Sequence, residues 1–215
     1  MTARMNKIYT IGYASYSLPE FIGVLKLFAV DAVADVRTVP YSRFRPEFNQ
    51  DTLAKQLISA GIRYVALGRE CGARPDDPAC YVNGQVKFDL LAGTELFRSG
   101  IRRLGIGAER FVIAIMCAEQ DPVQCHRGIL VARELSKQYP ELEIIHILPD
   151  RKTECMKETE SRLLQMYGLD KEEIPGLGRS FAERLAEAYA GQGAKIAWHP
   201  NNDRNEKDQK PDGGL

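Results

Sequence analysis

The segment Phe111-Val-Ile-Ala-Ile-Met116, followed by Cys117-Ala-Glu119, decides how this chain folds. An apolar run of this length between polar residues is typical of a buried β-strand. Gln120-Asp-Pro122 then predicts a turn, and the amphipathic run from Pro122 to Gln138 predicts a helix. A strand that leads through a short turn into a helix is the repeating unit of an α/β sheet.

The same pattern recurs on both sides of this segment. Further strands are expected at residues 8–12, 32–36, 63–67 and 143–148. Further helices are expected at residues 17–28, 49–61, 90–104, 153–167 and 180–189. The alternation predicts a three-layer α/β domain, Rossmann-like, with a mostly parallel sheet and helices on both faces.

This α/β domain is expected to span residues 5–170. A linker at residues 171–175 is expected to lead into a C-terminal helical extension that covers 171–199. Residues 200–215 are almost without apolar side chains and are expected to be disordered. The irregular segment 68–88 is expected to cover the carboxyl edge of the sheet.

The composition is that of an ordinary globular protein. The chain has 215 residues, and 29 Lys and Arg balance 29 Asp and Glu, so the formal net charge is zero. This balance argues against a global basic field for nucleic acid and leaves only local basic patches. We expect no membrane association and a cytoplasmic location, since the chain lacks an apolar run of about 18 residues and a signal peptide. The five cysteines are expected to be reduced.

Polar side chains gather where four of the expected strands end. They lie in residues 12–15, 35–45, 68–74 and 117–127. Ligands of open α/β sheets bind outside the carboxyl ends of the strands. The sequence therefore predicts a site at this edge.

Five of these residues have side chains suited to catalysis. Cys117 is the candidate nucleophile, provided that a nearby cation lowers its pKa, and Cys125 lies near a helix N-terminus that favours a thiolate. Asp35 and Glu119 would act as general acid or base or orient a ribose hydroxyl, and His126 would shuttle protons. The alternatives are packed thiols, ion pairs with the loop arginines and a structural histidine.

Arginines interleaved with aromatic residues predict an anionic ligand. The forked guanidinium groups of Arg37, Arg43 and Arg127 suit phosphate, and Tyr41 and Phe44 suit stacking on a base. The alternative is a solvated, charged loop. The expected ligand-binding residues are Gly12, Ser15, Arg37, Ser42, Arg43, Cys125 and Arg127.

Several of these segments resemble a known family. The segments Thr10–Ser15, Asp35–Arg43, Gly61–Tyr64 and Met116–Arg127 resemble the bacterial and archaeal family catalogued as domain of unknown function 488. The resemblance extends over residues 8–198. It implies a compact α/β fold and a shared site, and it implies no particular activity.

These observations leave three functions open. The first is an enzyme, a hydrolase or group transferase, that acts on a phosphorylated, nucleotide or nucleic-acid ligand. The second is a non-catalytic module that grips nucleic acid with the loop Arg37–Phe48. The expected partner is an anionic small molecule or nucleotide, with nucleic acid as the alternative, and the oligomeric state is left open.

The third function is that of a zinc protein. Cys117, Cys125 and His126 would supply three ligands, and Glu119 or a water would supply the fourth. Cys71 would join them if the irregular segment folds back. Neighbouring residues on a helix point about 100° apart, so Cys125 and His126 are not expected to reach one ion. The sequence also identifies no acceptor for the second histidine nitrogen. No cofactor is therefore predicted, and zinc remains an alternative.

Overall fold

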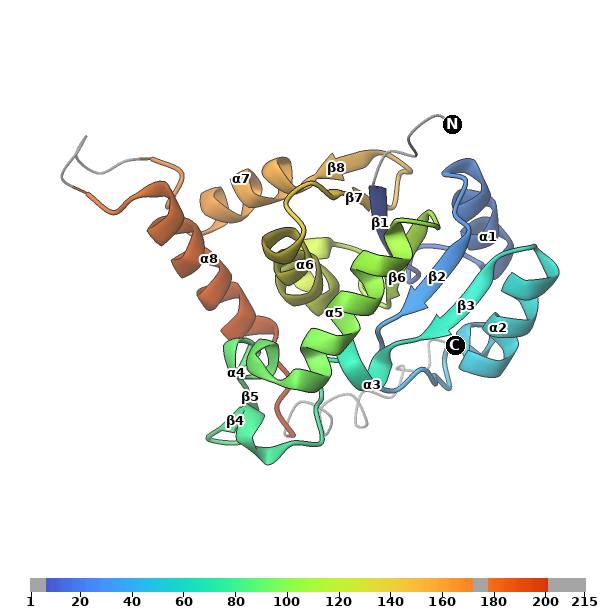
Figure 1. The fold of residues 1–215 in the computed structure, drawn as a ribbon, viewed down its shortest axis with the longest axis horizontal. Coiled ribbons are helices and arrows are strands. Elements are labelled where there is room, and N and C mark those ends of the chain that lie inside the picture. Colours follow the sequence, from blue (N-terminus) through green and yellow to red (C-terminus); the bar gives the residue numbers. More distant parts are fainter. Residues whose placement is uncertain (1–6, 172–177, 201–215) are drawn as a thin grey trace, which may run out of the picture.

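The computed structural model describes residues 7–171 and 178–200, and it is built on a six-stranded sheet (Figure 1). The strand order is β3-β2-β6-β1-β7-β8, in which β8 runs antiparallel to β7 and the other neighbours are parallel. The predicted mostly parallel α/β sheet is thus confirmed. The strands are β1 (Lys7–Gly12), β2 (Ala32–Asp35), β3 (Arg63–Ala66), β6 (Ile113–Cys117), β7 (Glu143–Ile147) and β8 (Thr153–Cys155).

Two helices cover one face of the sheet. They are α1 (Leu18–Leu27) and α2 (Gln50–Ser59), and Phe21 and Leu53 from them pack in one cluster with Val33 and Met116 of the sheet. The start of α1 follows the predicted signal, since the Ser17 hydroxyl accepts from the Glu20 amide and the Glu20 carboxylate accepts from the Ser17 amide.

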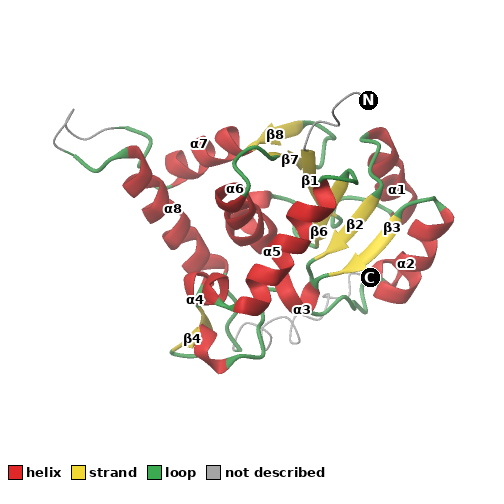
Figure 2. Ribbon diagram, viewed as in Figure 1, coloured by secondary structure: helices red, strands yellow, loops and turns green. Residues whose placement is uncertain are grey.

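The other face is covered by helices from the middle of the chain (Figure 2). Phe97 and Ile101 of α5 and Leu135 of α6 pack there with strand residues such as Ile115. With α1 and α2 on the opposite face, the sheet is the middle of three layers. The helical segments on this side are α3 (Gly68–Cys71), α4 (Phe88–Gly93), α5 (Glu95–Ala108), η4 (Arg127–Ala132, π-helical) and α6 (Arg133–Gln138).

The last two helices form a smaller cluster of their own. In it, α7 (Met156–Met166) and α8 (Phe181–Ile196) pack against η4 and the short turn η3 (Pro122–Gln124). The helix expected at 180–189 continues to Ile196. The expected linker and disordered tail fall almost entirely outside the described residues.

Some expectations about local structure were wrong. Residues 153–155 form strand β8 and not the start of a helix, because they pair with the edge strand β7. The irregular segment 68–88 holds α3, the turn η2 (Pro78–Cys80) and a hairpin of β4 (Tyr81–Val82) and β5 (Gln85–Val86). Asn83 and Gly84 connect the hairpin with φ of 51° and 78°, the conformation that an Asn-Gly pair favours.

Within the described residues, no helix combines the length and the apolar character needed to cross a membrane.

Candidate functional site

A cavity of about 660 Å³ lies where the carboxyl ends of β1, β2 and β6 meet. Its position is the one expected for a ligand site in an open α/β sheet. It is lined by Tyr13, residues of the loop 37–44, Ala73, Arg74, residues 117–119 and 124–126, Ile196 and Trp198.

The pairing of β1 with β6 places Cys117 at this edge. Gly12 lies opposite Cys117 in the parallel register, and beyond the strands the Tyr13 amide donates to the Cys117 carbonyl at 3.1 Å. A Cβ on Gly12 would lie 1.7 Å from the carbonyl oxygen of Glu119. Only glycine therefore lets the loop after β6 fold this closely onto β1.

The single helix expected at 122–138 is broken, and this expectation was wrong. Residues 122–124 form η3, where the Asp121 carboxylate accepts from the Val123 amide at 3.0 Å. Cys125 is extended, with φ −134° and ψ 140°, and helical geometry begins only at His126, with φ −59° and ψ −24°. The separation of about 100° between successive helical side chains therefore does not apply to this pair.

The break brings two thiols and an imidazole together. His126 Nδ1 lies 3.7 Å from Cys117 Sγ and 3.9 Å from Cys125 Sγ, and the three atoms all lie within 4.8 Å of one another. The objection that neighbouring residues could not reach one point was therefore wrong. Cys117 and Cys125 are buried, at 6% and 2% exposure, yet both line the cavity.

The second nitrogen of His126 also has a partner. Nε2 lies 3.0 Å from the carbonyl oxygen of Val36, at the end of β2. A carbonyl oxygen only accepts, so Nε2 carries a hydrogen and donates it to Val36, while Nδ1 faces the two thiols. This carbonyl is the acceptor that sequence reasoning could not identify.

The pKa values of the two thiols are shifted in opposite directions. A hydrogen bond to Cys125, together with burial, raises the pKa of Cys117 well above its usual value. Burial also acts to raise the pKa of Cys125, but the hydrogen bond from Cys117 and the positive charge of Arg127 outweigh it and hold that pKa well below its usual range. The two thiols titrate as a coupled pair, in which Cys125 gives up its proton more readily than Cys117 does.

Asp35 and Arg37 form a buried ion pair beside the cavity. Arg37 Nη2 lies 2.6 Å from the Asp35 carboxylate and donates to the Phe48 carbonyl at 2.9 Å, while the Tyr64 hydroxyl donates to Asp35 at 2.7 Å. Arg37 lines the cavity and Asp35 does not. The carboxylate therefore serves to hold the guanidinium in place.

Arg127 and Ser15 are not brought to the cavity. Arg127 is fully buried, and its guanidinium donates to the main-chain carbonyls of Glu119 and Gln120. The arginine thus shapes the loop after β6 from behind. The Ser15 hydroxyl is buried, and the described residues offer it no hydrogen-bond partner.

The loop after β2 supplies the outer wall. The Ser42 hydroxyl accepts from the amides of Phe44 and Arg45, both at 3.2 Å, and so organises this turn. Arg43 is exposed and lines the cavity, and no acidic side chain of the described residues pairs with it. Tyr41 and Phe44 line the same wall and are 67% and 78% exposed.

Trp198 was missed by sequence reasoning. It follows α8 and reaches the cavity, where the guanidinium of Arg74 lies 5.2 Å from the centre of its ring. Its indole Nε1 is buried without a hydrogen-bond partner among the described residues. The available signal was compositional, because this is the one tryptophan in the chain.

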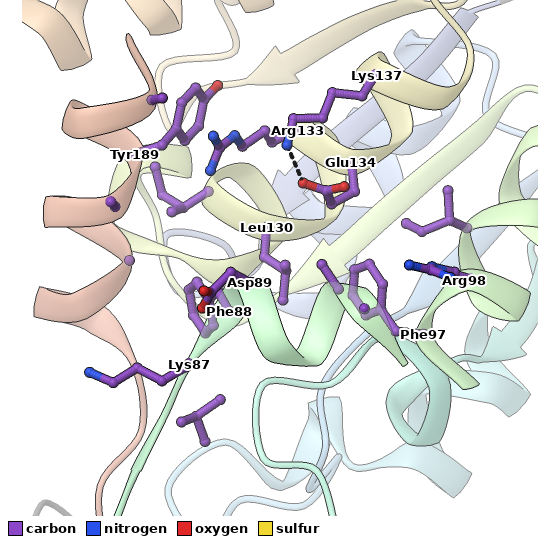
Figure 3. Close-up of a pocket in the computed structure, with 18 of the residues that line it drawn as sticks. Lys87, Phe88, Asp89, Phe97, Arg98, Leu130, Arg133, Glu134, Lys137 and Tyr189 are labelled. Carbon is purple, nitrogen blue, oxygen red and sulfur yellow. Dashed lines mark hydrogen bonds and ion pairs between the residues drawn. The ribbon is translucent and has the colours of Figure 1, made fainter. Parts of the chain in front are cut away.

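A second, larger cavity lies away from this edge (Figure 3). It measures about 920 Å³ and is lined by α4, α5, α6, α8 and η4, and no candidate residue of the site lies in it. Several of its charges are already engaged, since Lys137 pairs with Glu134 at 2.6 Å and Arg133 lies 4.2 Å from the ring centre of Tyr189. We place the chemistry in the smaller cavity because the thiols and the imidazole are there.

Comparison with known proteins identifies a family over the part of the fold that carries the cluster. A family model described as "Domain of unknown function DUF488" matches residues 17–133, more than half of the chain. The matched range includes the loop after β2 and the cluster of Cys117, Cys125 and His126. No curated protein and no solved structure matches the chain.

Proposed function

The chain belongs to the family described as domain of unknown function DUF488, and for this member we propose an enzyme, a hydrolase or group transferase that acts on a phosphorylated or nucleotide ligand. The observation that carries the proposal is the cluster of Cys117, Cys125 and His126 in a cavity that Arg43 also lines. A reactive cluster and a phosphate-binding group in one cavity are the two parts that such an enzyme needs.

Recognition of the ligand would begin with the arginines. Arg43 is exposed and has no acidic partner among the described residues, so its guanidinium is available to a phosphate. Arg37 lines the same cavity and is held by Asp35. Tyr41, Phe44 and Trp198 add ring faces on which a base can stack.

In the hydrolytic form of the reaction, water adds across a phosphate ester. The water oxygen bonds to phosphorus, the bond from phosphorus to the ester oxygen breaks, and the ester oxygen leaves with a proton. In group transfer an acceptor hydroxyl takes the place of water. Glu119 lines the cavity, so its carboxylate is the candidate to accept the proton.

A thermal-shift screen tests the proposal. Inorganic phosphate, nucleoside monophosphates and nucleoside triphosphates would each be added to the wild type. A ligand at about 100 times its Kd stabilises the native state by about 2.7 kcal/mol, which raises Tm by several degrees. The fluorescence of Trp198, the one tryptophan, should change with the same ligand because the side chain lines the cavity.

Two arginine variants locate the binding. Arg43→Ala should lose most of the shift, because it removes the guanidinium from the proposed cavity. Arg98→Ala is the matched control, since Arg98 is also exposed but lines the larger cavity (Figure 3). No stabilisation by any phosphate compound, or a shift lost in Arg98→Ala and kept in Arg43→Ala, would overturn the proposal.

The exposed rings of Tyr41 and Phe44 favour a second candidate function. Large exposed aromatic side chains beside an arginine suit stacking on the bases of a single strand, without catalysis. Binding of a labelled oligonucleotide that weakens steeply with salt would support this module. The double variant of Tyr41→Ala and Phe44→Ala should then lose binding, and binding that ignores salt would contradict it.

We also propose a cytoplasmic location for the protein. All five cysteines are free thiols. Free thiols persist in reducing compartments, whereas an oxidising compartment would join Cys117 to a thiol as near as that of Cys125.

A further inference from the structure

We propose that Cys117, Cys125 and His126 bind one zinc ion, with the fourth coordination position open to the cavity. The inference deepens the proposed function and rests on it, because it names the chemical agent of the same cavity. Binding of the ion itself can be measured without any substrate.

The distances within the cluster match the edges of a zinc tetrahedron. With Zn–S of about 2.3 Å and Zn–N of about 2.0 Å, tetrahedral angles put a sulfur and a nitrogen ligand about 3.5 Å apart. His126 Nδ1 lies 3.7 Å and 3.9 Å from the two Sγ atoms. An ion could bind if these two nitrogen–sulfur distances shortened by a few tenths of an ångström.

The orientation of His126 is also that of a metal ligand. Metal-bound histidines nearly always donate their second ring hydrogen to a carboxylate, a main-chain carbonyl or a water. Here Nε2 donates to the Val36 carbonyl at 3.0 Å, which leaves Nδ1 free to bind. Val36 ends the β2 region and is fully buried, so the acceptor is held rigidly.

The donor set selects the ion. Two sulfurs and one imidazole nitrogen suit zinc better than hard ions such as Mg²⁺ or Ca²⁺, which prefer oxygen. The charge is favourable as well, because a bound dication deprotonates the thiols that coordinate it.

The structure leaves one coordination position open. In the described residues, no fourth histidine, cysteine or carboxylate joins the three ligand atoms. Cys71 was a further ligand only on the condition that residues 68–88 fold back, and it does not join them: its side chain is buried in the core beside α5 and does not line the cavity. Three protein ligands with a fourth position for water are the mark of a catalytic zinc site.

Such an ion would supply the chemistry that the proposed function needs. Zinc lowers the pKa of a bound water to near 7, so the water loses a proton to solvent or to Glu119 and leaves a hydroxide. Zinc deaminases use the same combination, one histidine and two cysteines on the metal and a glutamate that is not a ligand. Glu119 lines the cavity and lies outside the cluster of three ligands.

Elemental analysis is the first test. The full chain, purified with a reductant and without chelator, should hold about one equivalent of zinc. The variants Cys117→Ser, Cys125→Ser and His126→Gln should each fall below roughly a tenth of an equivalent. Cys155→Ser is the matched control, because Cys155 lies at the start of α7 outside the cluster, and it should keep the wild-type content.

Cobalt substitution tests the geometry in the wild type, in case a variant does not fold. Cobalt in the site should give the strong visible bands of a tetrahedral complex and a near-ultraviolet band from bound thiolate. Azide or inorganic phosphate should then alter the visible bands, because it replaces the water at the open position. Visible bands that azide and phosphate leave unchanged would show that the fourth coordination position is already occupied by the protein. That result would overturn the proposal that this position is open to the cavity.

The outcomes separate this inference from the proposed function. Less than a tenth of an equivalent of zinc in the wild type, together with no cobalt bands, would overturn the metal site. The Arg43-dependent stabilisation by phosphate compounds would still stand on its own. Full zinc occupancy, together with no change in Tm on addition of any phosphate compound, would support the metal site and overturn the proposed phosphorylated or nucleotide ligand.

Discussion

Gly12 and Arg127 control the site from positions outside the lining of the cavity. Gly12 gives the Glu119 carbonyl room at the end of β1, and the Arg127 guanidinium donates to the carbonyls of Glu119 and Gln120 from the buried side. Both residues act on the same loop after β6. At the scale of single residues, the shape of the site thus depends on a missing side chain and on a buried one.

Substitution of Gly12 should be severe, while a matched glycine should tolerate the same change. Gly12→Ala puts a Cβ 1.7 Å from a main-chain oxygen, so the loop must move, and we expect a loss of about 3 kcal/mol or more in the free energy of unfolding. Gly23→Ala, in the exposed middle of α1, meets nothing within 4 Å and should stabilise by about 0.5–1 kcal/mol. Denaturant unfolding measures the free energy of unfolding of both variants. Equal changes in the two variants would contradict the steric argument.

His146 should make the fold sensitive to acid. The ring is fully buried, Nδ1 lies 2.7 Å from the Thr10 hydroxyl, and Nε2 has no partner among the described residues. Burial, with the nearby charges of Arg127 and Arg162, lowers the pKa of His146 to about 3. The unfolded chain, with a histidine pKa of about 6.5, therefore binds a proton that the native state does not bind.

The stability from His146 is complete above about pH 6.5 and is lost as the pH falls toward about 3. At pH 5 the loss should be about 2 kcal/mol relative to neutral pH. His146→Gln should not show this loss of about 2 kcal/mol when its free energy of unfolding is measured at pH 7.5 and pH 5. If variant and wild type lose the same free energy between these two pH values, the acid sensitivity comes from other groups.

At the scale of elements, the break between η3 and η4 creates the cluster. The break is anchored by Asp121, whose carboxylate caps η3 and pairs with Arg162 of α7 at 2.7 and 2.8 Å. Burial acts to raise the pKa of Asp121, but the hydrogen bonds from Arg162 and Val123 lower it below its usual value. Helix α7 thus helps to fix the break between η3 and η4 and, with it, the positions of Cys125 and His126.

Asp121→Ala should weaken both the fold and the cluster. Loss of the cap and of a half-buried ion pair should cost about 1–2 kcal/mol. Asp150→Ala is the control, because its ion pair with Lys152 is exposed, and it should leave the free energy of unfolding almost unchanged. Alkylation of Cys125 should also become faster in Asp121→Ala, and an unchanged rate would show that the anchor does not hold the cluster.

At the scale of the whole molecule, α8 lies outside the matched family segment and still completes the site. Its Gln192 is fully buried, donates to the Val123 carbonyl at 2.6 Å and accepts from the Tyr167 hydroxyl at 3.0 Å. Ile196 and Trp198 then continue from this helix into the cavity. The C-terminal helix is therefore part of the same folded unit as the sheet.

Gln192→Ala should show this coupling. It leaves a buried carbonyl without its donor, so unfolding free energy should fall by about 1–3 kcal/mol. Trp198 fluorescence should change in the native variant as well, because the end of α8 loses its attachment to η3. Lys195→Ala, on the exposed side of the same helix, is the control and should change neither quantity. A stable Gln192→Ala with an unchanged spectrum would show that α8 is held by other contacts.

Local patterns predicted most of the sheet and the helices. Alternation and apolar runs identified all five parallel strands, and the pattern Ser17-Leu-Pro-Glu20 marked the start of α1. Such features depend on residues near one another in sequence, which is why one chain suffices to find them. Strand β8 escaped because Thr153–Cys155 is extended only through its pairing with β7.

The sequence by itself determined the five parallel strands, the family and the sheet edge at which the polar residues gather. Only the tertiary structure decided which of those residues meet in the cavity. The direction of a side chain depends on backbone angles that distant contacts fix, as at Cys125, and burial depends on what packs from elsewhere. For this reason Asp35 and Arg127 became supports behind the site, while two thiols and a histidine that seemed unable to meet came within 4.8 Å of one another.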